Sequence, residues 1–379
     1  ANMYTGTGVW TGIGYGGGIL TISDNTIGAT TGNNNIVVET TSNFHVASYG
    51  IAGGIDGANV TVSDNTIGSI DVSSSVNYSH IFVGIQNDGA TEITISSNLV
   101  GSETTAQSIN ASTQCMHTET GQHVAGIVNN ANTTTCTIDN NTIKNITNAS
   151  ESGGSSEGAS PFGHTIMGIA ATDGVNTITS NTVTNLSTSS IDFRTEAVRG
   201  ISVVSNVQGQ SISGNIISSL STTNNLDNSK LVGIYYDGPT TGTNEVSSNQ
   251  IFNITSAEYS GLASVIKGVH IQDGVTTTFV NNVISLGSDE TAGHEIIGIY
   301  TSKNGNFFHN SVNIDGGVSG SLDANTYAFR INLDISTAVV KNNIFVNTRT
   351  NSGSGKNYAA LCQGTIELDY NAYWVDGAG

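Results

Sequence analysis

The stretch Ile212-Ser213-Gly214-Asn215-Ile216-Ile217 shows the unit from which this chain is built. An apolar residue stands three positions before the asparagine, and another stands two positions after it. The spacing occurs eleven times, with the asparagine at Asn25, Asn65, Asn98, Asn141, Asn181, Asn215, Asn249, Asn282, Asn310, Asn343 and Asn371. Because the repeat runs through the whole sequence, we expect a single elongated domain over residues 1–379 in which similar units stack on one another.

The two flanking positions are apolar in all eleven copies, which predicts two continuous columns in a core. The column before the asparagine is Ile22, Val62, Ile95, Ile138, Ile178, Ile212, Val246, Phe279, Phe307, Val340 and Leu368. The column after it is Ile27, Ile67, Val100, Ile143, Val183, Ile217, Ile251, Ile284, Val312, Phe345 and Tyr373. A Gly followed by Ile or Val precedes the asparagine by about 11 to 15 residues in nine copies, and Ala328-Phe329 and Ala360-Leu361 replace it in the last two.

Composition and spacing together favour strands joined by polar turns. The chain has 46 Gly, 2 Pro and 10% charged residues, and no stretch shows helical periodicity. Successive asparagines are 28 to 43 residues apart, and all of this variation follows the second apolar column. We therefore expect a solenoid with variable loops on one flank. Asparagine tolerates left-handed backbone and its amide can bond the copy in the next coil, so we expect a stacked asparagine ladder in the turns.

The pattern resembles the right-handed parallel β-helix of pectate-lyase-like proteins, in which asparagine-containing turns stack into a ladder. It is still more similar to β-helical repeats in large secreted surface proteins of Bacteroidetes-type bacteria, through Gly298-Ile299-Tyr300, His309-Asn310-Ser311-Val312, Asn342-Asn343-Ile344-Phe345-Val346-Asn347 and Asp369-Tyr370-Asn371-Ala372-Tyr373. The resemblance covers nearly the whole chain. It implies an all-β, right-handed parallel β-helix of about eleven coils, roughly 50 Å long at the usual strand spacing, and an extracellular or cell-surface location.

The charge balance excludes several classes of partner. Lys and Arg total 10 against 29 Asp and Glu, which gives a formal net charge of −19, and no basic cluster is present. Such a surface repels nucleic acid, and no apolar run is long enough for membrane insertion. Cys115 and Cys136 either pair across one repeat or stay unpaired. The first residues carry neither an initiator Met nor a signal segment, so we expect a piece of a longer chain.

Candidate binding residues follow from strand alternation after each Gly-Ile or Gly-Val pair, because the residue after the Ile or Val should point outward. This outward column is Ala52, Gln86, Val128, Ala170, Ser202, Tyr235, His270, Tyr300 and Arg330. A second outward column, two positions further on, contains Asp237, Gln272 and Asn332. Rings, amides and carboxylates in neighbouring coils suit a glycan platform made of Tyr235, Asp237, His270, Gln272, Tyr300, Arg330 and Asn332. The alternative is a row of exposed side chains that only stabilises the sheet.

Catalysis has less support from the residues. An inverting or retaining hydrolase needs carboxylates about 5 to 9.5 Å apart, whereas Asp289-Glu290 lies in a variable loop. No Gly-His-Gly segment of the pectinase type is present. The sequence therefore favours a non-catalytic secreted or cell-surface β-helix that acts as an adhesin, a fibre component or a carbohydrate-binding module. The alternative is a polysaccharide lyase or glycoside hydrolase that uses the Tyr235–Arg330 face, with Asp237 or Asp273 near a calcium ion.

Cofactor and partner expectations are modest. Acidic loop residues either bind structural calcium or are solvated; they are Asp71, Glu103, Glu151, Glu157, Asp227, Asp289, Glu290 and Asp323. The isolated histidines lack metal-ligand spacing, so no metal site is predicted from them. The expected partners are glycans or neighbouring copies of the chain. Binding of ice or another crystal is disfavoured, because the outward columns do not repeat Thr.

Overall fold

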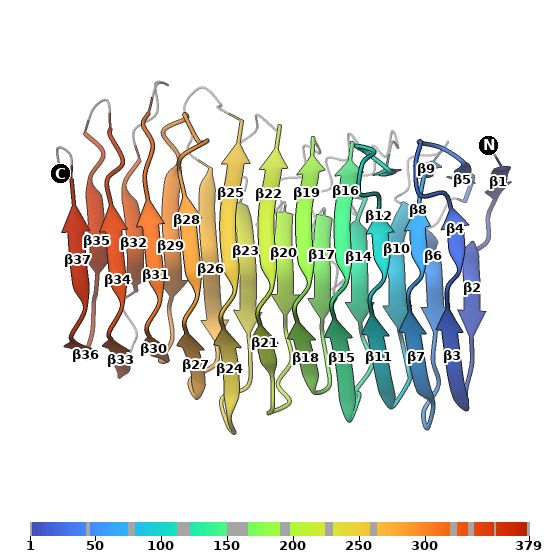
Figure 1. Ribbon diagram of the computed structural model, residues 1–379, viewed down its shortest axis with the longest axis horizontal. Helices are drawn as coiled ribbons and strands as arrows, with labels where there is room; N and C mark the ends of the chain where they lie inside the picture. Colours follow the sequence, from blue (N-terminus) through green and yellow to red (C-terminus); the bar gives the residue numbers. More distant parts are fainter. Residues whose placement is uncertain are drawn as a thin grey trace.

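The computed structural model describes residues 2–42, 46–74, 80–111, 122–149, 166–189, 198–223, 230–257, 264–318, 324–332, 337–351 and 354–376. Every named element is a β-strand, and every strand pairing between these elements is parallel. The strands stack along one long axis from β1 (Asn2–Gly6) to β37 (Ala372–Val375) (Figure 1). The prediction of an all-β, right-handed parallel β-helix of about eleven coils is confirmed.

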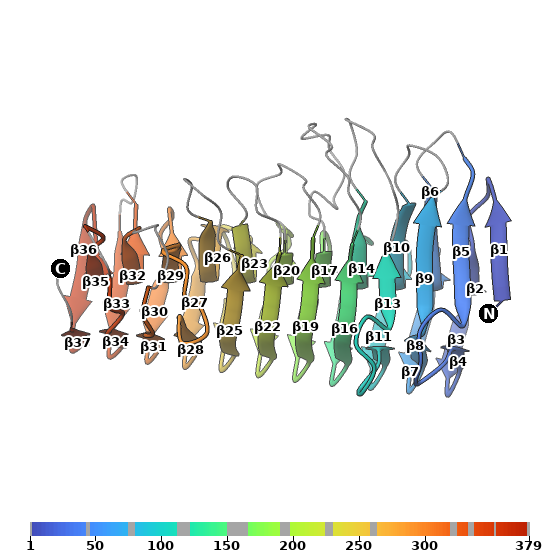
Figure 2. The same cartoon turned by 90° about the horizontal axis from the view of Figure 1, so that it is seen from above.

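Three sheets run the length of the solenoid, and the chain passes through sheet II, sheet III and sheet I in each coil (Figures 1 and 2). Sheet I contains β1, β4 (Thr26–Gly28), β5 (Ile36–Thr40), β8 (Thr66–Gly68), β9 (Ile70–Ser74), β12 (Leu99–Gly101), β13 (Ile109–Ala111), β16 (Thr142–Asn148), β19 (Thr182–Thr188), β22 (Ile216–Thr222), β25 (Gln250–Ser256), β28 (Val283–Leu286), β31 (Ser311–Ile314), β34 (Ile344–Asn347) and β37.

Sheet II contains β2 (Thr11–Tyr15), β6 (Val46–Gly53), β10 (His80–Asn87), β14 (Val124–Asn129), β17 (Ile166–Ala171), β20 (Val198–Val203), β23 (Lys230–Asp237), β26 (Val265–Asp273), β29 (Glu295–Thr301), β32 (Thr326–Ile331) and β35 (Asn357–Leu361). Sheet III contains β3 (Ile19–Ser23), β7 (Asn59–Ser63), β11 (Glu92–Ser96), β15 (Thr135–Asp139), β18 (Asn176–Thr179), β21 (Ser211–Ser213), β24 (Asn244–Ser247), β27 (Thr277–Val280), β30 (Asn306–Phe308), β33 (Ala338–Lys341) and β36 (Ile366–Asp369).

The asparagine ladder lies at the corner between sheet III and sheet I. In a typical rung, the backbone N–H and Nδ2 of Asn181 both donate to Oδ1 of Asn215, each at 3.0 Å. Nδ2 of Asn215 then donates to Oδ1 of Asn249 and to the carbonyl of Ile178, both at 2.9 Å. Because Asn215 is fully buried, this pattern satisfies an amide that would otherwise be costly to bury. The predicted ladder is confirmed, with its amides bonded from Asn25 to Asn371.

The expectation that the ladder asparagine itself adopts the left-handed backbone is wrong. The left-handed residue in each turn is the one before the asparagine, for example Asp64 at φ 56° and Ser180 at φ 56°. Asp, Ser, Asn, Gly, His and Tyr all occupy this exposed position, which therefore sets the bend without a fixed residue type. The asparagine itself is selected by its side chain, which needs a donor and an acceptor at the same time.

The core lies between the three sheets and changes in composition along the axis. Ile and Val fill both columns in the first seven coils, as predicted. Later coils bury phenylalanine instead: Phe279 stacks on Phe307 with ring centroids 5.2 Å apart, and Phe329 stacks on Phe345 at 4.9 Å. These offset contacts continue the core through larger side chains.

The glycine before each Ile or Val marks the closest approach of sheet II to sheet I. A Cβ at Gly200 would lie 2.5 Å from Cγ2 of Ile217 and 2.6 Å from the carbonyl oxygen of Gly233. No side chain fits there without displacing a core residue or the next coil, because real Cβ contacts are longer. The glycines of sheet II and the second apolar column of sheet I therefore pack directly against each other.

Sequence reasoning missed a second ladder of buried amides, at the corner between sheet II and sheet III. Asn87 donates to Asn129 at 2.8 Å, Asn129 donates to Asn176 at 2.9 Å, and Asn176 donates to Gln210 at 3.1 Å. These side chains are buried. The segments of variable length lie at two places in the coil. Residues 29–35 and 102–108 interrupt a strand of sheet I, whereas the other variable segments follow the sheet I strand.

Candidate functional site

The predicted outward column exists as a register column on sheet II. Pairing aligns Gln86 with Val128, Val128 with Ala170, and Ala170 with Ser202. It continues through Tyr235, His270, Tyr300 and Arg330, one residue per coil. Neighbours in such a column are about 4.8 Å apart. Strand alternation was therefore sufficient to predict which side chains share this face.

Pointing away from the core does not make the first part of this column exposed. Val128 and Ala170 are buried with Val83, Ala125 and Met167 in a second apolar cluster, and Gln86 and Ser202 are buried as well. His270 is only 8% exposed, so the expectation that it is an open platform residue is wrong. Tyr235, Tyr300, Arg330 and Asn332 are half-buried. The accessible part of the face is thus confined to the later coils.

The later coils hold a continuous row of rings and cations, which we call the ring row: Arg199, Tyr235, Lys267, His270, Tyr300, Arg330 and Asn332. The guanidinium carbon of Arg199 lies 3.5 Å from the ring centroid of Tyr235. The Tyr235 and His270 rings meet edge to face at 5.1 Å, and those of His270 and Tyr300 at 5.2 Å. Edge-to-face and cation–ring contacts orient each side chain through its neighbour.

Polar contacts fix the far end of the ring row. Nζ of Lys267 is 4.5 Å from the Tyr300 ring centroid and 3.3 Å from Nδ1 of His270. Arg330 pairs with Glu295 at 2.6 Å, and Nδ2 of Asn332 donates to the Tyr300 hydroxyl at 3.3 Å. The arrangement presents two half-exposed phenol rings between cationic and amide groups, which can stack on a sugar ring and bond its hydroxyls.

A bulge changes the second outward column. The register shifts between Tyr236 and Asp237, so that Asp237 pairs with Asp273 and Gln272 is the extra residue. The expectation that Asp237 and Gln272 align is therefore wrong; Gln272 is exposed beside the column. Burial raises the pKa of Asp237 above its ordinary value, and the charge of Asp273 raises it further, while the cationic groups of Arg199 and Lys303 oppose both effects. Two carboxylates thus meet at one edge of the ring row.

The acidic residues proposed for calcium differ in their surroundings: Asp289 is exposed, and Asp71 lies in β9, not in a loop, and accepts a bond from Asn110 at 3.1 Å. Glu290 is buried, and its carboxylate accepts backbone N–H groups from Ser256 at 2.7 Å and Ala292 at 2.8 Å. The expectation that it is a solvated loop acid is wrong. Glu103 pairs with Lys144 at 2.9 Å. Glu151, Glu157, Asp227 and Asp323 lie outside the described residues. Within the described ranges, no group of three or more His, Cys, Asp or Glu could hold a metal ion.

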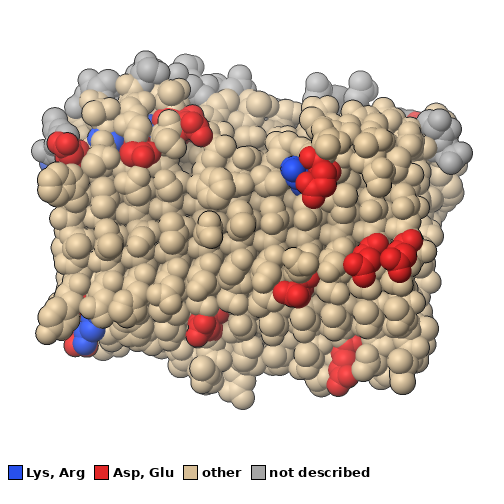
Figure 3. All heavy atoms as spheres, in the orientation of Figure 1, with Lys and Arg blue, Asp and Glu red and all other residues tan. Residues whose placement is uncertain are grey.

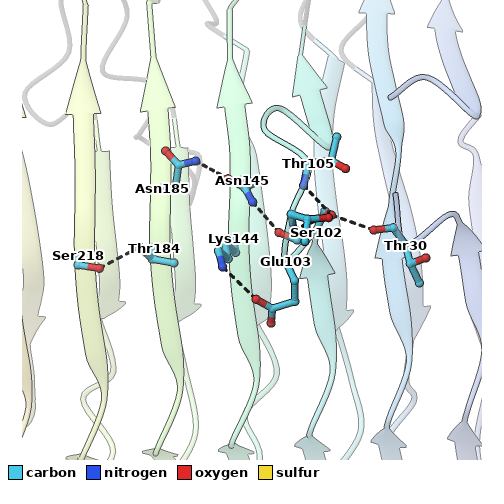
Figure 4. Close-up of polar contacts among 10 residues, drawn as sticks. Thr30, Ser102, Glu103, Thr105, Lys144, Asn145, Thr184, Asn185 and Ser218 are labelled. Carbon is cyan, nitrogen blue, oxygen red and sulfur yellow. Dashed lines mark hydrogen bonds and ion pairs between the residues drawn. The ribbon is translucent and has the colours of Figure 1, made fainter. Parts of the chain in front are cut away.

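The outward side of sheet I carries a polar network around Ser102 (Figure 4). Its hydroxyl donates to the carbonyl of Thr30 at 2.8 Å and accepts the backbone N–H of Thr105 at 3.1 Å. Its carbonyl accepts from Nδ2 of Asn145 at 2.6 Å, and Asn185 in turn donates to Asn145. The bonds join the two loops that interrupt sheet I to the first two unbroken strands, so we assign the network a structural role.

Threonine does repeat on sheet III, contrary to the expectation that no outward column repeats it. Thr21, Thr61, Thr94, Thr137 and Thr177 are register neighbours on five consecutive coils. The outward columns predicted from the sequence lie on the strand after each Gly, which belongs to sheet II. Asp139 and Glu92 flank the threonine column on the same sheet, so the surface combines hydroxyls with negative charge.

The fold and the site define the chain as a parallel β-helix solenoid with a mixed aromatic and cationic row on one sheet. Searches of protein-family models, curated proteins and solved structures found no match to it. The part of the chain that the structure describes forms no helix long and apolar enough to cross a membrane.

Cys136 is buried, which raises the pKa of its thiol to about 12, and Cys115 lies outside the described residues.

Proposed function

We propose that this chain is a non-catalytic β-helix of a secreted or cell-surface protein and that it binds an extended glycan along the ring row. One observation supports this most: the rings of Tyr235 on β23 and Tyr300 on β29 are held half-exposed next to cationic groups, with the His270 ring of β26 between them. Preorganised rings lose little entropy on binding. The resemblance to β-helical repeats of Bacteroidetes-type surface proteins, within the pectate-lyase-like group, supports a role as an adhesin or fibre component.

Glycan binding is tested with a panel of neutral and acidic polysaccharides by affinity electrophoresis. Loss of both rings in Tyr235→Ala/Tyr300→Ala should weaken binding of the best ligand at least tenfold, because each stacked ring contributes about 1 kcal/mol or more. Tyr370→Ala is the matched control, since Tyr370 is 81% exposed on the sheet III to sheet I turn, away from the row. Unchanged binding by the double variant would contradict the proposal.

A second candidate function, polysaccharide hydrolysis or lysis, rests on the bulge at Gln272. It sets Asp237 beside Asp273, and the raised pKa of Asp237 suits a proton donor. In this reading Asp237 protonates the leaving oxygen or the pair holds a calcium ion near a uronate. Release of reducing or unsaturated ends from the bound polysaccharide, abolished in Asp237→Asn, would establish this enzyme activity; binding without any product favours the non-catalytic function.

A further inference from the structure

The outward side of sheet I changes character halfway along the solenoid. The earlier strands carry charge, with Glu39 on β5, Asp71 on β9 and Lys144 on β16. From β19 to β37, seven successive strands of this sheet contain no Asp, Glu, Lys or Arg. In a chain with a net charge of −19, this is a large uncharged area. Figure 3 shows it as a broad tan band across the C-terminal coils, with red and blue groups along the upper margin of the band.

This area also exposes apolar side chains. We call the outward side chains of β22, β25, β28, β31, β34 and β37 the neutral face. Ile216, Phe252, Val283, Ile344 and Trp374 on it are 37% to 62% exposed. Uncharged polar residues lie at other positions of the face, among them Gln250, Ser311 and Asn313. Several large apolar side chains exposed on neighbouring strands of one uncharged face commonly mark an interaction surface.

We propose that a second copy of this chain docks on the neutral face. Two molecules of charge −19 repel each other over most of their surfaces, so close approach is cheapest where neither presents charge. The neutral face consists of consecutive strands at the C-terminal end of a regular parallel sheet, and two such sheets pack well at about 10 Å separation. A second copy offers a complementary uncharged partner surface by construction, as an isologous two-fold contact requires.

The charge distribution also selects the orientation of the pair. In a parallel pairing, the acidic earlier coils of both copies would lie close together, including Asp24 and Asp64 beside the same face. In an antiparallel pairing centred between β28 and β31, the neutral faces overlap while the acidic halves extend in opposite directions. Coulomb repulsion is smaller in this arrangement because the like charges are further apart. We infer that the dimer is antiparallel, with β22 of one copy over β37 of its partner.

The size of the neutral face predicts a weak dimer. Six strands at about 4.8 Å spacing, each about 15 to 20 Å long, give on the order of 500 Å² per partner. Stable interfaces bury about 800 Å² per partner, so the contact falls at the low end of specific association. Dimerisation should therefore depend on concentration in the micromolar range.

Sedimentation velocity of the 379-residue chain from about 1 to 300 μM in moderate salt tests the contact. The unmodified chain should pass from monomer to dimer over this range, and Val283→Glu should raise the dimer dissociation constant at least tenfold. Val275→Glu is the matched control, since Val275 is an exposed valine of the same coil but lies in the turn between β26 and β27. The proposal would be overturned if the chain stayed monomeric throughout or if both variants weakened the dimer equally. It would also be overturned if the chain did not dimerise but bound an insoluble neutral polysaccharide in a way that Val283→Glu abolished.

Orientation is tested with the double variant Ile216→Lys/Ala372→Glu. In the antiparallel dimer each new lysine faces a new glutamate, so the dissociation constant should stay equal or fall at low salt and rise as salt screens the pairs. In a parallel dimer lysine would face lysine and glutamate would face glutamate. If the double variant dimerises more weakly than the unmodified chain at low salt and added salt removes the difference, the antiparallel arrangement is overturned. The Val283→Glu result would still decide whether the neutral face is the contact.

Discussion

At the scale of single residues, the ladder asparagine is required for both halves of its amide. Oδ1 of Asn215 accepts two bonds from Asn181 while Nδ2 donates to Ile178 and Asn249. In Asn215→Asp, an oxygen would replace the donor and face two acceptors about 3 Å away. We expect a loss of about 3 kcal/mol or more in the free energy of unfolding, since unsatisfied buried groups cost about 1 to 3 kcal/mol each. Chemical denaturation monitored by circular dichroism measures it.

The control for this substitution is at the turn position that directly precedes a ladder asparagine. Asn140 is exposed with φ 54°, and Asp24 and Asp64 occupy the same place in other coils. Asn140→Asp should therefore change stability by less than about 0.5 kcal/mol. Equal losses in Asn215→Asp and Asn140→Asp would show that added charge, and not the broken amide ladder, causes the effect.

A buried histidine predicts how stability responds to pH. Nδ1 of His80 bonds the carbonyl of Ser73 at 3.0 Å, and Nε2 bonds the hydroxyl of Ser48 at 2.6 Å. Burial lowers the pKa of His80 below its ordinary 6.5. The unfolded chain then binds the proton at higher pH than the folded chain. Stability from neutral His80 is present above about pH 6.5 and falls as the pH drops below it, by up to about 1.4 kcal/mol per pH unit.

Denaturation at pH 7, 6 and 5 measures this dependence. The decline should be shallower in His80→Gln, which cannot take up the proton. His309→Asn serves as the control, because His309 is exposed at a left-handed turn position that Asn342 occupies in the next coil. The same pH slope in the unmodified chain and in His80→Gln would contradict the assignment.

The residues that sequence could predict are those whose spacing is constant. The ladder asparagines have two apolar neighbours at fixed positions, so they were found in every coil. The second ladder changes residue type from Asn176 to Gln210, and its members are 42, 47 and 34 residues apart. Variable segments intervene between them, so no periodic signal reveals that these amides meet.

At the scale of elements, the contact between sheet II and sheet I leaves no room for a side chain at Gly200. In Gly200→Ala the new methyl would press on Ile217 and on the carbonyl of Gly233. Overpacking of this kind costs about 1 to 3 kcal/mol, so the free energy of unfolding should fall by that amount. Gly16→Ala is the control, because a Cβ at Gly16 meets nothing within 4 Å. An unchanged stability in Gly200→Ala would mean that the sheets can separate at little cost.

The ring row shows where element-level prediction ends. Alternation along β23, β26, β29 and β32 was enough to align Tyr235, His270, Tyr300 and Arg330. Alternation does not report how deeply an outward side chain is covered, so the burial of His270 could not be predicted from it. It also assumes an even register, so the bulge that pairs Asp237 with Asp273 was not predicted. The binding role of the row stays a prediction.

At the scale of the whole molecule, negative charge should weaken the fold at low ionic strength. The ion pairs Lys144–Glu103, Arg330–Glu295 and Lys341–Glu367 are partly exposed, so each offsets little of the repulsion that comes with a net charge of −19. Asp24 and Asp64 occupy the same turn position in consecutive coils, about one strand spacing of 4.8 Å apart. Added salt screens such repulsion, because the Debye length falls from about 30 Å at 0.01 M to about 10 Å at 0.1 M.

We therefore expect the midpoint of thermal unfolding to rise as NaCl increases from about 10 to 300 mM, measured at low micromolar protein so that self-association does not contribute. Asp64→Asn should be more stable than the unmodified chain at low salt, since asparagine accepts the left-handed turn and removes one of the two neighbouring charges. The advantage should shrink as salt rises. A midpoint that falls with salt would mean that attraction within the ion pairs outweighs the repulsion, and an advantage of Asp64→Asn that persists at 300 mM would assign its effect to backbone preference.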